Sequence, residues 1–176
     1  GFKYDLRKKK KGFSYYSSIK SLKGYELVAV CEKKKFIFPF KTNIKIYQNL
    51  TTMLKKEKID ILIIASSNET HYKIAKIAIL AGIKFIVCEK PFRFSDQKKI
   101  EILRLIKKKQ KISVNFSRRF SHEYDSLINN IKKKKYGNLE SVKVSFTRGI
   151  INNGCHYIDF LTYIFNQNCH QKPDYK

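Results

Sequence analysis

The sequence predicts an α/β fold: a doubly wound parallel sheet followed by the start of an α+β domain. Short apolar runs, typical of strands buried on both faces, alternate with segments of helical periodicity over residues 25–116. Such alternation builds parallel sheets through right-handed crossovers. After residue 119 the pattern changes to a helix, a strand with one polar face, a loop and a second helix. We therefore expect one domain over residues 1–116 and a second over residues 117–176.

The predicted strands are apolar and rich in β-branched or aromatic residues. Residues 2–6 alternate weakly, as a short or edge strand does, and the basic run 7–11 follows. Pro91 ends a strand, because proline lacks the N–H group that a strand ladder needs. The four buried strands of the sheet are expected at residues 25–31, 59–65, 85–88 and 112–116.

Capping residues place the helices between these strands. Asn49 and Ser95 are suited to helix N-termini, and Gly24 and Gly82 to helix C-termini. The helices of the first domain are expected at residues 13–22, 50–56, 72–80 and 96–109. The second domain is expected to hold a helix at 122–135, a half-buried strand at 139–147 and a helix at 155–165.

The composition indicates a folded protein in a reducing compartment, which we take to be the cytoplasm. Hydrophobic residues make up 43% of the chain, and the four cysteines form no Cys-x-x-Cys pair. No cluster has metal-ligand spacing, and no apolar stretch is long enough to span a bilayer. The net charge of +24 comes largely from scattered lysines without an aromatic recognition motif, which favours compositional bias over nucleic-acid binding.

Glu32 follows the strand at 25–31, about 20 residues after Gly12. An acid at this place in a dinucleotide-binding βαβ unit binds the adenosine ribose, although an ordinary strand-end acid would look the same. If Gly12 is the last glycine of a phosphate-binding loop, Arg7 and Lys9 occupy the positions of the first two. Their side chains would stand where the backbone should approach a pyrophosphate.

Two further strand ends carry polar residues. Ser66, Asn68 and His71 lie after the strand at 59–65, where they either line a dinucleotide cleft or cap the helix that begins near Thr70. Glu89 and Lys90 follow the strand at 85–88, at the edge of an α/β sheet where ligands bind. They are a candidate proton-transfer or cofactor-contacting pair, and the alternative is a solvated strand end.

His156 is a candidate acid/base at the start of the last helix. An imidazole can exchange a proton near neutral pH, and Asp159 is placed one turn further on, where it can orient the ring. A single histidine is more often structural.

These segments together resemble the Gfo/Idh/MocA oxidoreductases, which act on sugars, inositols and sugar derivatives with NAD or NADP. The most specific segment reads Gly-Ile-Lys-Phe-Ile-Val-Cys-Glu-Lys-Pro, similar to the Glu-Lys-Pro signature of the family. The resemblance covers most of the chain, through segments 25–32, 66–71, 82–91, 115–120 and 154–159. It implies a Rossmann-like dinucleotide-binding domain at 1–116 and a substrate domain from 117.

The resemblance also implies roles for individual residues. Lys90 would lie near the nicotinamide and the reacting hydroxyl, and His156 would take the proton while hydride goes to the cofactor. Asn152 stands at the position where many members of the family carry an aspartate that partners the catalytic histidine. The cofactor cleft would be lined by Gly12, Glu32, Ser66, Asn68, His71, Glu89 and Lys90.

Several positions depart from the family pattern. Arg7 and Lys9 replace glycines, Tyr15 stands where a histidine is usual, and the Asn152 amide cannot accept a proton as a carboxylate does. We also expect the second domain to be truncated, because family members continue into a large open sheet. The functional hypothesis is hydride transfer on a sugar or sugar-nucleotide substrate in a possible homo-oligomer. The alternatives are a non-catalytic nucleotide-binding or interaction domain and, more weakly, polyanion binding.

Replacing the two basic residues by the glycines of the family pattern, Arg7→Gly with Lys9→Gly, should tighten dinucleotide binding. Without the two side chains, the backbone can approach the pyrophosphate. Fluorescence titration with NADH measures the change, and an unaltered affinity would mean that residues 7–12 are not the phosphate loop.

Overall fold

The computed structural model describes residues 14–35, 37, 38 and 40–165. The chain divides into two compact units, Gly1–Val114 and Asn115–Lys176, which are described separately below. None of the described helices combines the length and apolar composition that crossing a bilayer requires.

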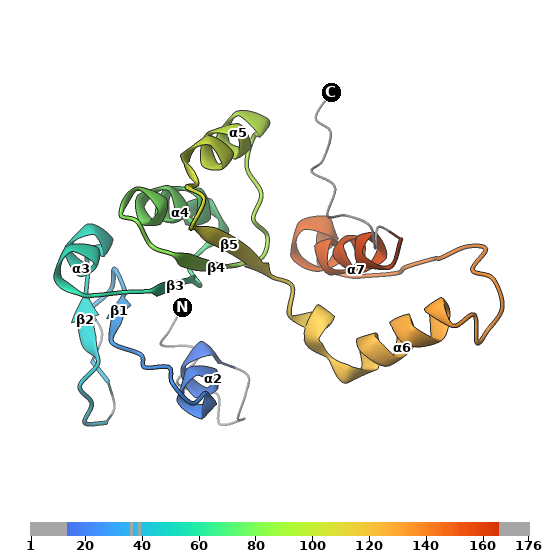
Figure 1. The fold of residues 1–176 in the computed structure, drawn as a ribbon, viewed down its shortest axis with the longest axis horizontal. Coiled ribbons are helices and arrows are strands. Elements are labelled where there is room, and N and C mark those ends of the chain that lie inside the picture. The colour runs from blue at the N-terminus through green and yellow to red at the C-terminus, as the bar shows by residue number, and fades with distance from the viewer. Residues whose placement is uncertain (1–13, 36, 39, 166–176) are drawn as a thin grey trace. The chain divides into compact units, whose positions relative to one another are not determined.

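The first unit has the predicted parallel α/β architecture (Figure 1). Strands β1 (Ala29–Cys31) and β2 (Lys45–Tyr47) pair in parallel, with Val30 opposite Ile46. Strands β3 (Ile61–Ile64), β4 (Phe85–Glu89) and β5 (Lys111–Asn115) form a second sheet in the order β3-β4-β5. Within the described residues the strands therefore form two sheets, and the short strand β2 was not predicted.

The helices of this unit are α2 (Tyr15–Ser21), α3 (Leu50–Lys56), α4 (His71–Leu80) and α5 (Asp96–Leu105), with the short 3-10 helix η1 (Asn68–Thr70) before α4. The C-caps of α2 and α4 are Leu22 and Ala81 and not the predicted Gly24 and Gly82, whereas α3 and α5 begin after their predicted caps, Asn49 and Ser95. The Asn49 side chain accepts a hydrogen bond from the Thr52 N–H at 3.0 Å, and Ser95 caps α5 in the same way. Such caps satisfy N–H groups that have no partner inside the helix.

Helix α5 ends at Leu105, four residues before the predicted end at Lys109. The chain turns instead, and the buried Gln110 side chain accepts from the Lys107 N–H at 3.1 Å. The Gln110 amide also donates to the carbonyl oxygens of Ile79 and Ile83, both at 3.0 Å. Gln110 thus connects the turn after α5 to the end of α4. These contacts hold residues 106–109 in a turn, although their sequence predicts a continued helix.

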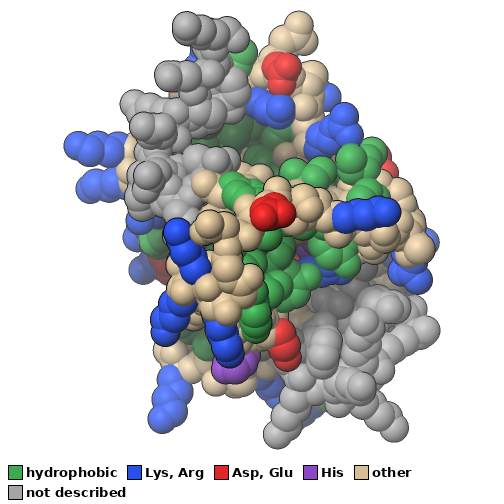
Figure 2. Space-filling view, turned by 90° about the vertical axis from the view of Figure 1, so that its right-hand side faces the viewer, with side chains coloured by type: hydrophobic (Ala, Val, Ile, Leu, Met, Phe, Trp, Pro, Cys, Tyr) green, Lys and Arg blue, Asp and Glu red, His purple; other side chains and the backbone are tan. Residues whose placement is uncertain are grey.

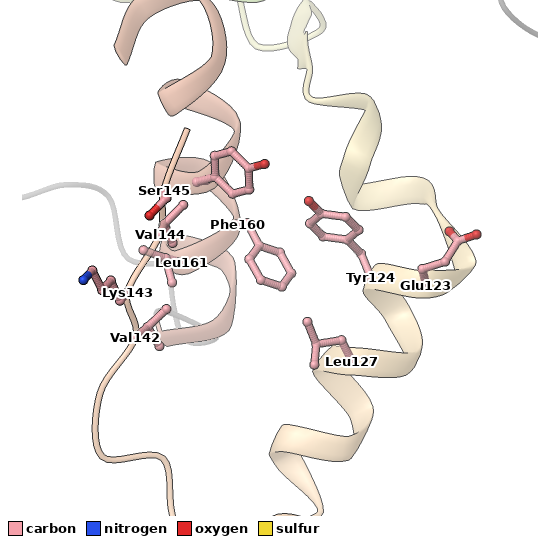
Figure 3. A pocket seen from close by; sticks show the side chains of 10 residues that line it. Glu123, Tyr124, Leu127, Val142, Lys143, Val144, Ser145, Phe160 and Leu161 are labelled. Atoms are coloured by element: carbon pink, nitrogen blue, oxygen red, sulfur yellow. The ribbon is translucent and has the colours of Figure 1, made fainter. Parts of the chain in front are cut away.

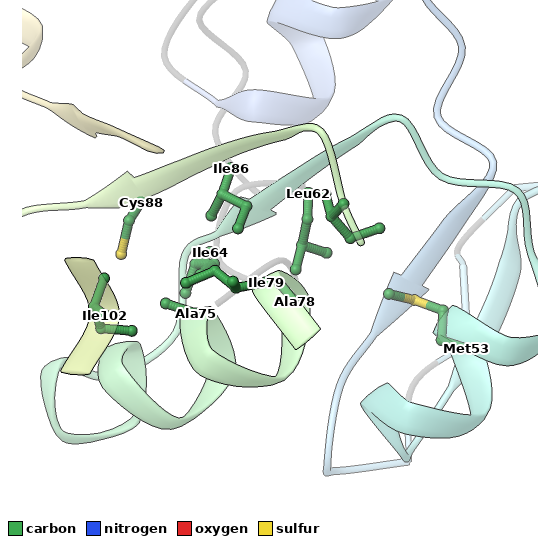
Figure 4. Packing of buried hydrophobic residues seen from close by; sticks show 10 residues of the cluster. Met53, Leu62, Ile64, Ala75, Ala78, Ile79, Ile86, Cys88 and Ile102 are labelled. Atoms are coloured by element: carbon green, nitrogen blue, oxygen red, sulfur yellow. The ribbon is translucent and has the colours of Figure 1, made fainter. Parts of the chain in front are cut away.

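The core lies between α4 and the strands β3 and β4 (Figure 4). Ala75, Ala78 and Ile79 form the buried face of α4, each at most 1% exposed. They meet Leu62 and Ile64 of β3 and Ile86 and Cys88 of β4, while Met53 and Ile102 close the cluster. The two alanines leave room for the helix to approach the sheet closely. Helix α5 packs beside α4 (Figure 1).

The second unit contains two long helices, α6 (His122–Lys132) and α7 (Cys155–Phe165). Shorter turns, η2 (Ser117–Phe120) and η3 (Ile150–Gly154), precede them. The predicted strand at 139–147 is wrong: this segment has no regular structure. A strand requires a neighbour to pair its backbone groups, and no described segment pairs with this one.

Charged side chains are spread over the face of the molecule that Figure 2 shows. On the face in Figure 2, lysine and arginine side chains stand apart from one another, with hydrophobic side chains exposed between them. The exposed hydrophobic residues of the second unit include Leu139, Val142, Ile150 and Ile158.

Truncating the buried residue Ile86 to alanine should lower the free energy of unfolding by about 2–5 kcal/mol, because it leaves a cavity between α4 and the sheet. Ile61→Ala is the matched control, since Ile61 is 38% exposed in the neighbouring strand, and its loss should be clearly smaller. Urea unfolding of both variants measures the difference. Equal losses would contradict the described core.

Candidate active site

The carboxyl ends of β1, β3 and β4 carry most of the predicted site residues of the first unit. Glu32 follows β1, is partly buried, and its backbone N–H donates to the Tyr47 carbonyl at 2.9 Å. Ser66 and Asn68 lie in the loop after β3, and Lys90 follows β4 directly. Gly12 lies outside the described residues. The parallel pairing of β3 with β4 brings the loops that follow them to the same edge of the sheet.

The loop after β3 is held by its own hydroxyl groups. The Ser66 and Thr70 hydroxyl oxygens are 2.6 Å apart, and Thr70 Oγ1 donates to the Ser67 carbonyl at 2.7 Å. Ser66 and Asn68 are exposed on this loop. The loop therefore presents a hydroxyl and an amide to solvent at the sheet edge.

His71, by contrast, lies inside the protein. Its side chain is fully buried, with Nδ1 3.1 Å from the Pro91 carbonyl oxygen and Nε2 3.1 Å from the Ser66 carbonyl oxygen. Both ring nitrogens therefore face backbone atoms. A direct contact between His71 and a cofactor stays a prediction.

The loop after β4 is held from α2. The Tyr15 hydroxyl donates to Glu89 Oε1 at 2.6 Å, which joins the first residue of α2 to the last residue of β4. Glu89 and Lys90 are partly buried. The sequence singled out Tyr15 only as a departure from the family pattern, because nothing in its neighbourhood indicates a partner 74 positions away.

Cys88, next to this pair, is not a nucleophile. Burial, reinforced by the neighbouring Glu89 carboxylate, raises the pKa of the Cys88 thiol to about 12. The thiol is therefore neutral near pH 7 and belongs to the core.

In the second unit, two consecutive arginines hold the start of α7. Arg119 donates from Nε and Nη2 to the two carboxylate oxygens of Asp159, at 2.6 and 2.5 Å. Arg118 donates to Asn153 Oδ1 at 3.1 Å, and its guanidinium lies 4.6 Å from the centre of the Tyr157 ring. The Asp159 carboxylate, expected to orient His156, is thus engaged by Arg119.

His156 is partly buried, and its ring meets Phe116 edge to face at 6.0 Å between centres. Asn152 is exposed in η3. At Gly154, an added Cβ would lie 2.7 Å from Cζ of Phe146, so the turn into α7 requires glycine or movement of that ring. Sequence reasoning missed the arginines, although their position between a strand and a helix was visible.

An open pocket of about 440 Å³ lies between α6, α7 and the segment 142–145 (Figure 3). Its walls include Tyr124 and Leu127 from α6 and Phe160 and Leu161 from α7. None of the predicted site residues lines it. The described residues contain no group of three side chains suited to hold a metal ion.

Removing one member of the Arg119–Asp159 pair should loosen α7. Asp159 is 9% exposed, so Arg119→Ala leaves a largely buried carboxylate without its two charge-assisted bonds, at a cost of about 2 kcal/mol. Hydrogen exchange of residues 155–165 should accelerate. Asp125→Asn, at an exposed position of α6, is the control, and the same exchange in both variants would contradict this role.

Comparison with known proteins relates the chain to inositol dehydrogenases. Inositol 2-dehydrogenase/D-chiro-inositol 3-dehydrogenase of Lactiplantibacillus plantarum is 24% identical over 135 residues, which cover 69% of this chain and 38% of that protein. The chain thus spans well under half the length of this relative.

Solved structures share the fold. Myo-inositol 2-dehydrogenase from Lactobacillus plantarum superposes with a TM-score of 0.68 at 19% identity, covering 87% of this chain and 54% of that one. Scyllo-inositol dehydrogenase from Lactobacillus casei, solved with NAD(H) and scyllo-inositol, has a TM-score of 0.59 at 18% identity, covering 69% and 42%. At these identities the likeness shows the fold alone.

The family model for oxidoreductases with an NAD-binding Rossmann fold matches residues 12–116. The match spans more than half of the chain and includes β1 to β5 with the loops that carry Glu32, Ser66 and Lys90. The resemblance stated from the sequence is thereby confirmed, and the chain belongs to the Gfo/Idh/MocA family of NAD-binding oxidoreductases.

Proposed function

We propose that this chain holds the NAD-binding domain of an oxidoreductase that acts on a cyclic polyol or sugar. The observation that carries the proposal is the partly buried Glu89–Lys90 pair at the end of β4, on the sheet edge that also presents Ser66 and Asn68. Family membership and the inositol dehydrogenases among its relatives support the substrate class.

The described residues fit the adenosine end of NAD. The Glu32 carboxylate, partly buried at the end of β1, can accept hydrogen bonds from both hydroxyl groups of a ribose. The same negative charge would repel a 2′-phosphate, so we propose NAD in preference to NADP. The exposed Ser66 and Asn68 side chains, which follow β3 of the other sheet, would line another part of the cleft.

The reaction converts a substrate hydroxyl to a carbonyl. When bound, NAD supplies the nicotinamide ring that accepts the hydride from the substrate carbon. The Lys90 ammonium would donate a hydrogen bond to the reacting oxygen and stabilise the negative charge that develops there. The hydroxyl proton would go to the His156 imidazole, a role that rests on the family motif at residues 154–159. Asn152 cannot take this proton, because an amide is not a base.

The alternative is a nucleotide-binding domain without turnover. Asn152 favours it, since an amide stands where many family members carry an acid. The two functions differ in a single measurement, because only the enzyme reduces NAD in the presence of a polyol.

Lys90→Ala should lower the turnover of NAD with myo- or scyllo-inositol by about 100-fold or more, since the developing charge loses its partner. Lys84→Ala is the matched control: Lys84 precedes the opposite end of β4, where it pairs with Asp60 at 3.6 Å, so its loss should leave turnover unchanged. Absorbance of NADH at each polyol concentration provides the readout.

The unfolding midpoint of the Lys90 variant should match that of the wild type, because Lys90 lies outside the core cluster. Full activity in the variant would remove Lys90 from the catalytic site. Saturable NADH binding without turnover by the wild type would favour the nucleotide-binding domain, and no NADH binding would overturn the proposal.

A further inference from the structure

The His71 ring lies beneath the sheet edge that carries the candidate site. It belongs to the first turn of α4, and none of its side chain is exposed. Its two nitrogens meet carbonyl oxygens from different loops, Ser66 after β3 and Pro91 after β4, both at 3.1 Å. These partners lie 5 and 20 positions from His71 in the sequence.

In both contacts the His71 ring faces a hydrogen-bond acceptor. A backbone carbonyl oxygen only accepts hydrogen bonds, so the ring must donate wherever a bond exists. A neutral imidazole donates from one nitrogen, and a protonated imidazole donates from both. Hydrogen bonds to both loops at the same time therefore require that both ring nitrogens donate.

We propose that His71 is a positioning residue, which fixes the loop that bears Ser66 and Asn68 relative to the loop that bears Glu89 and Lys90. Two further contacts hold the loops individually: Thr70 bonds within the first loop, and Tyr15 holds the second from α2. Full burial places the ring behind the loops and away from a ligand on their outer side. The consequence for the reaction rests on the proposed function, whereas the connection itself does not.

Three variants separate the two anchors. The amide of His71→Asn can replace the Nδ1 donor toward Pro91, and the longer His71→Gln can replace the Nε2 donor toward Ser66. His71→Leu removes both donors and keeps the site filled with apolar atoms. Thr70→Val is the control, because it loosens the first loop without touching the second.

Hydrogen–deuterium exchange of the chain without NAD tests the connection directly. In His71→Leu, exchange should rise about tenfold in both segments 66–70 and 89–94, as expected for the loss of a buried hydrogen bond. His71→Asn should retain protection of segment 89–94, and His71→Gln that of segment 66–70. Thr70→Val should affect only segment 66–70.

Unchanged exchange of segment 89–94 in His71→Leu would overturn the proposal. An increase in the exchange of segment 89–94 in Thr70→Val equal to that in His71→Leu would overturn it too. If His71→Leu does not fold, the Asn and Gln variants still decide, because identical exchange patterns in the two would exclude separate anchors. NADH titration of the same variants reports on the proposed function separately. Weaker NADH binding with unchanged exchange would mean that His71 contacts the cofactor and is not a positioning residue.

Discussion

The packing of α4 against β3 and β4 is the interaction on which the first unit depends. Ala75 and Ala78 carry side chains so small that the helix lies close to the sheet, and Ile79, Ile64 and Ile86 fill the remaining space. Close packing fixes the helix along its whole length, so its first residue arrives under the ends of the two strands. The geometry of the candidate site is therefore set by apolar residues that take no part in chemistry.

Buried polar side chains fasten this helix at both ends. At its start, His71 faces carbonyl oxygens of the loops after β3 and β4. At its end, Gln110 donates to the carbonyls of Ile79 and Ile83. Hydrogen bonds depend on both distance and direction, so they add a restraint to the one that the close packing of the apolar core provides. Both ends of α4 thus receive a directional constraint from a buried polar side chain that faces backbone carbonyl oxygens.

Local patterns predicted most of the fold, because caps and apolar periodicity act over a few residues. The bounds of α3 and α7 agree with expectation, and Ser95 caps α5 as anticipated. The hydrogen-bonded side-chain pairs that join distant parts of each unit could not be predicted from local patterns. Tyr15 meets Glu89 across 74 positions and Arg119 meets Asp159 across 40, distances at which side-chain type indicates no partner. The expected strand at 139–147 failed for a related reason, since strand formation depends on a neighbour elsewhere in the chain.

Gln110 carries a stereochemical requirement that few amino acids meet. Its amide nitrogen serves two carbonyls while its oxygen receives the Lys107 N–H, so the position demands two donors and one acceptor at the end of a three-carbon stem. Glutamate would bring a negative charge against two carbonyl oxygens, methionine would remove all three hydrogen bonds, and asparagine is too short. We therefore expect that few amino acids other than glutamine are accepted at this position, for reasons of hydrogen-bond geometry that are independent of the substrate.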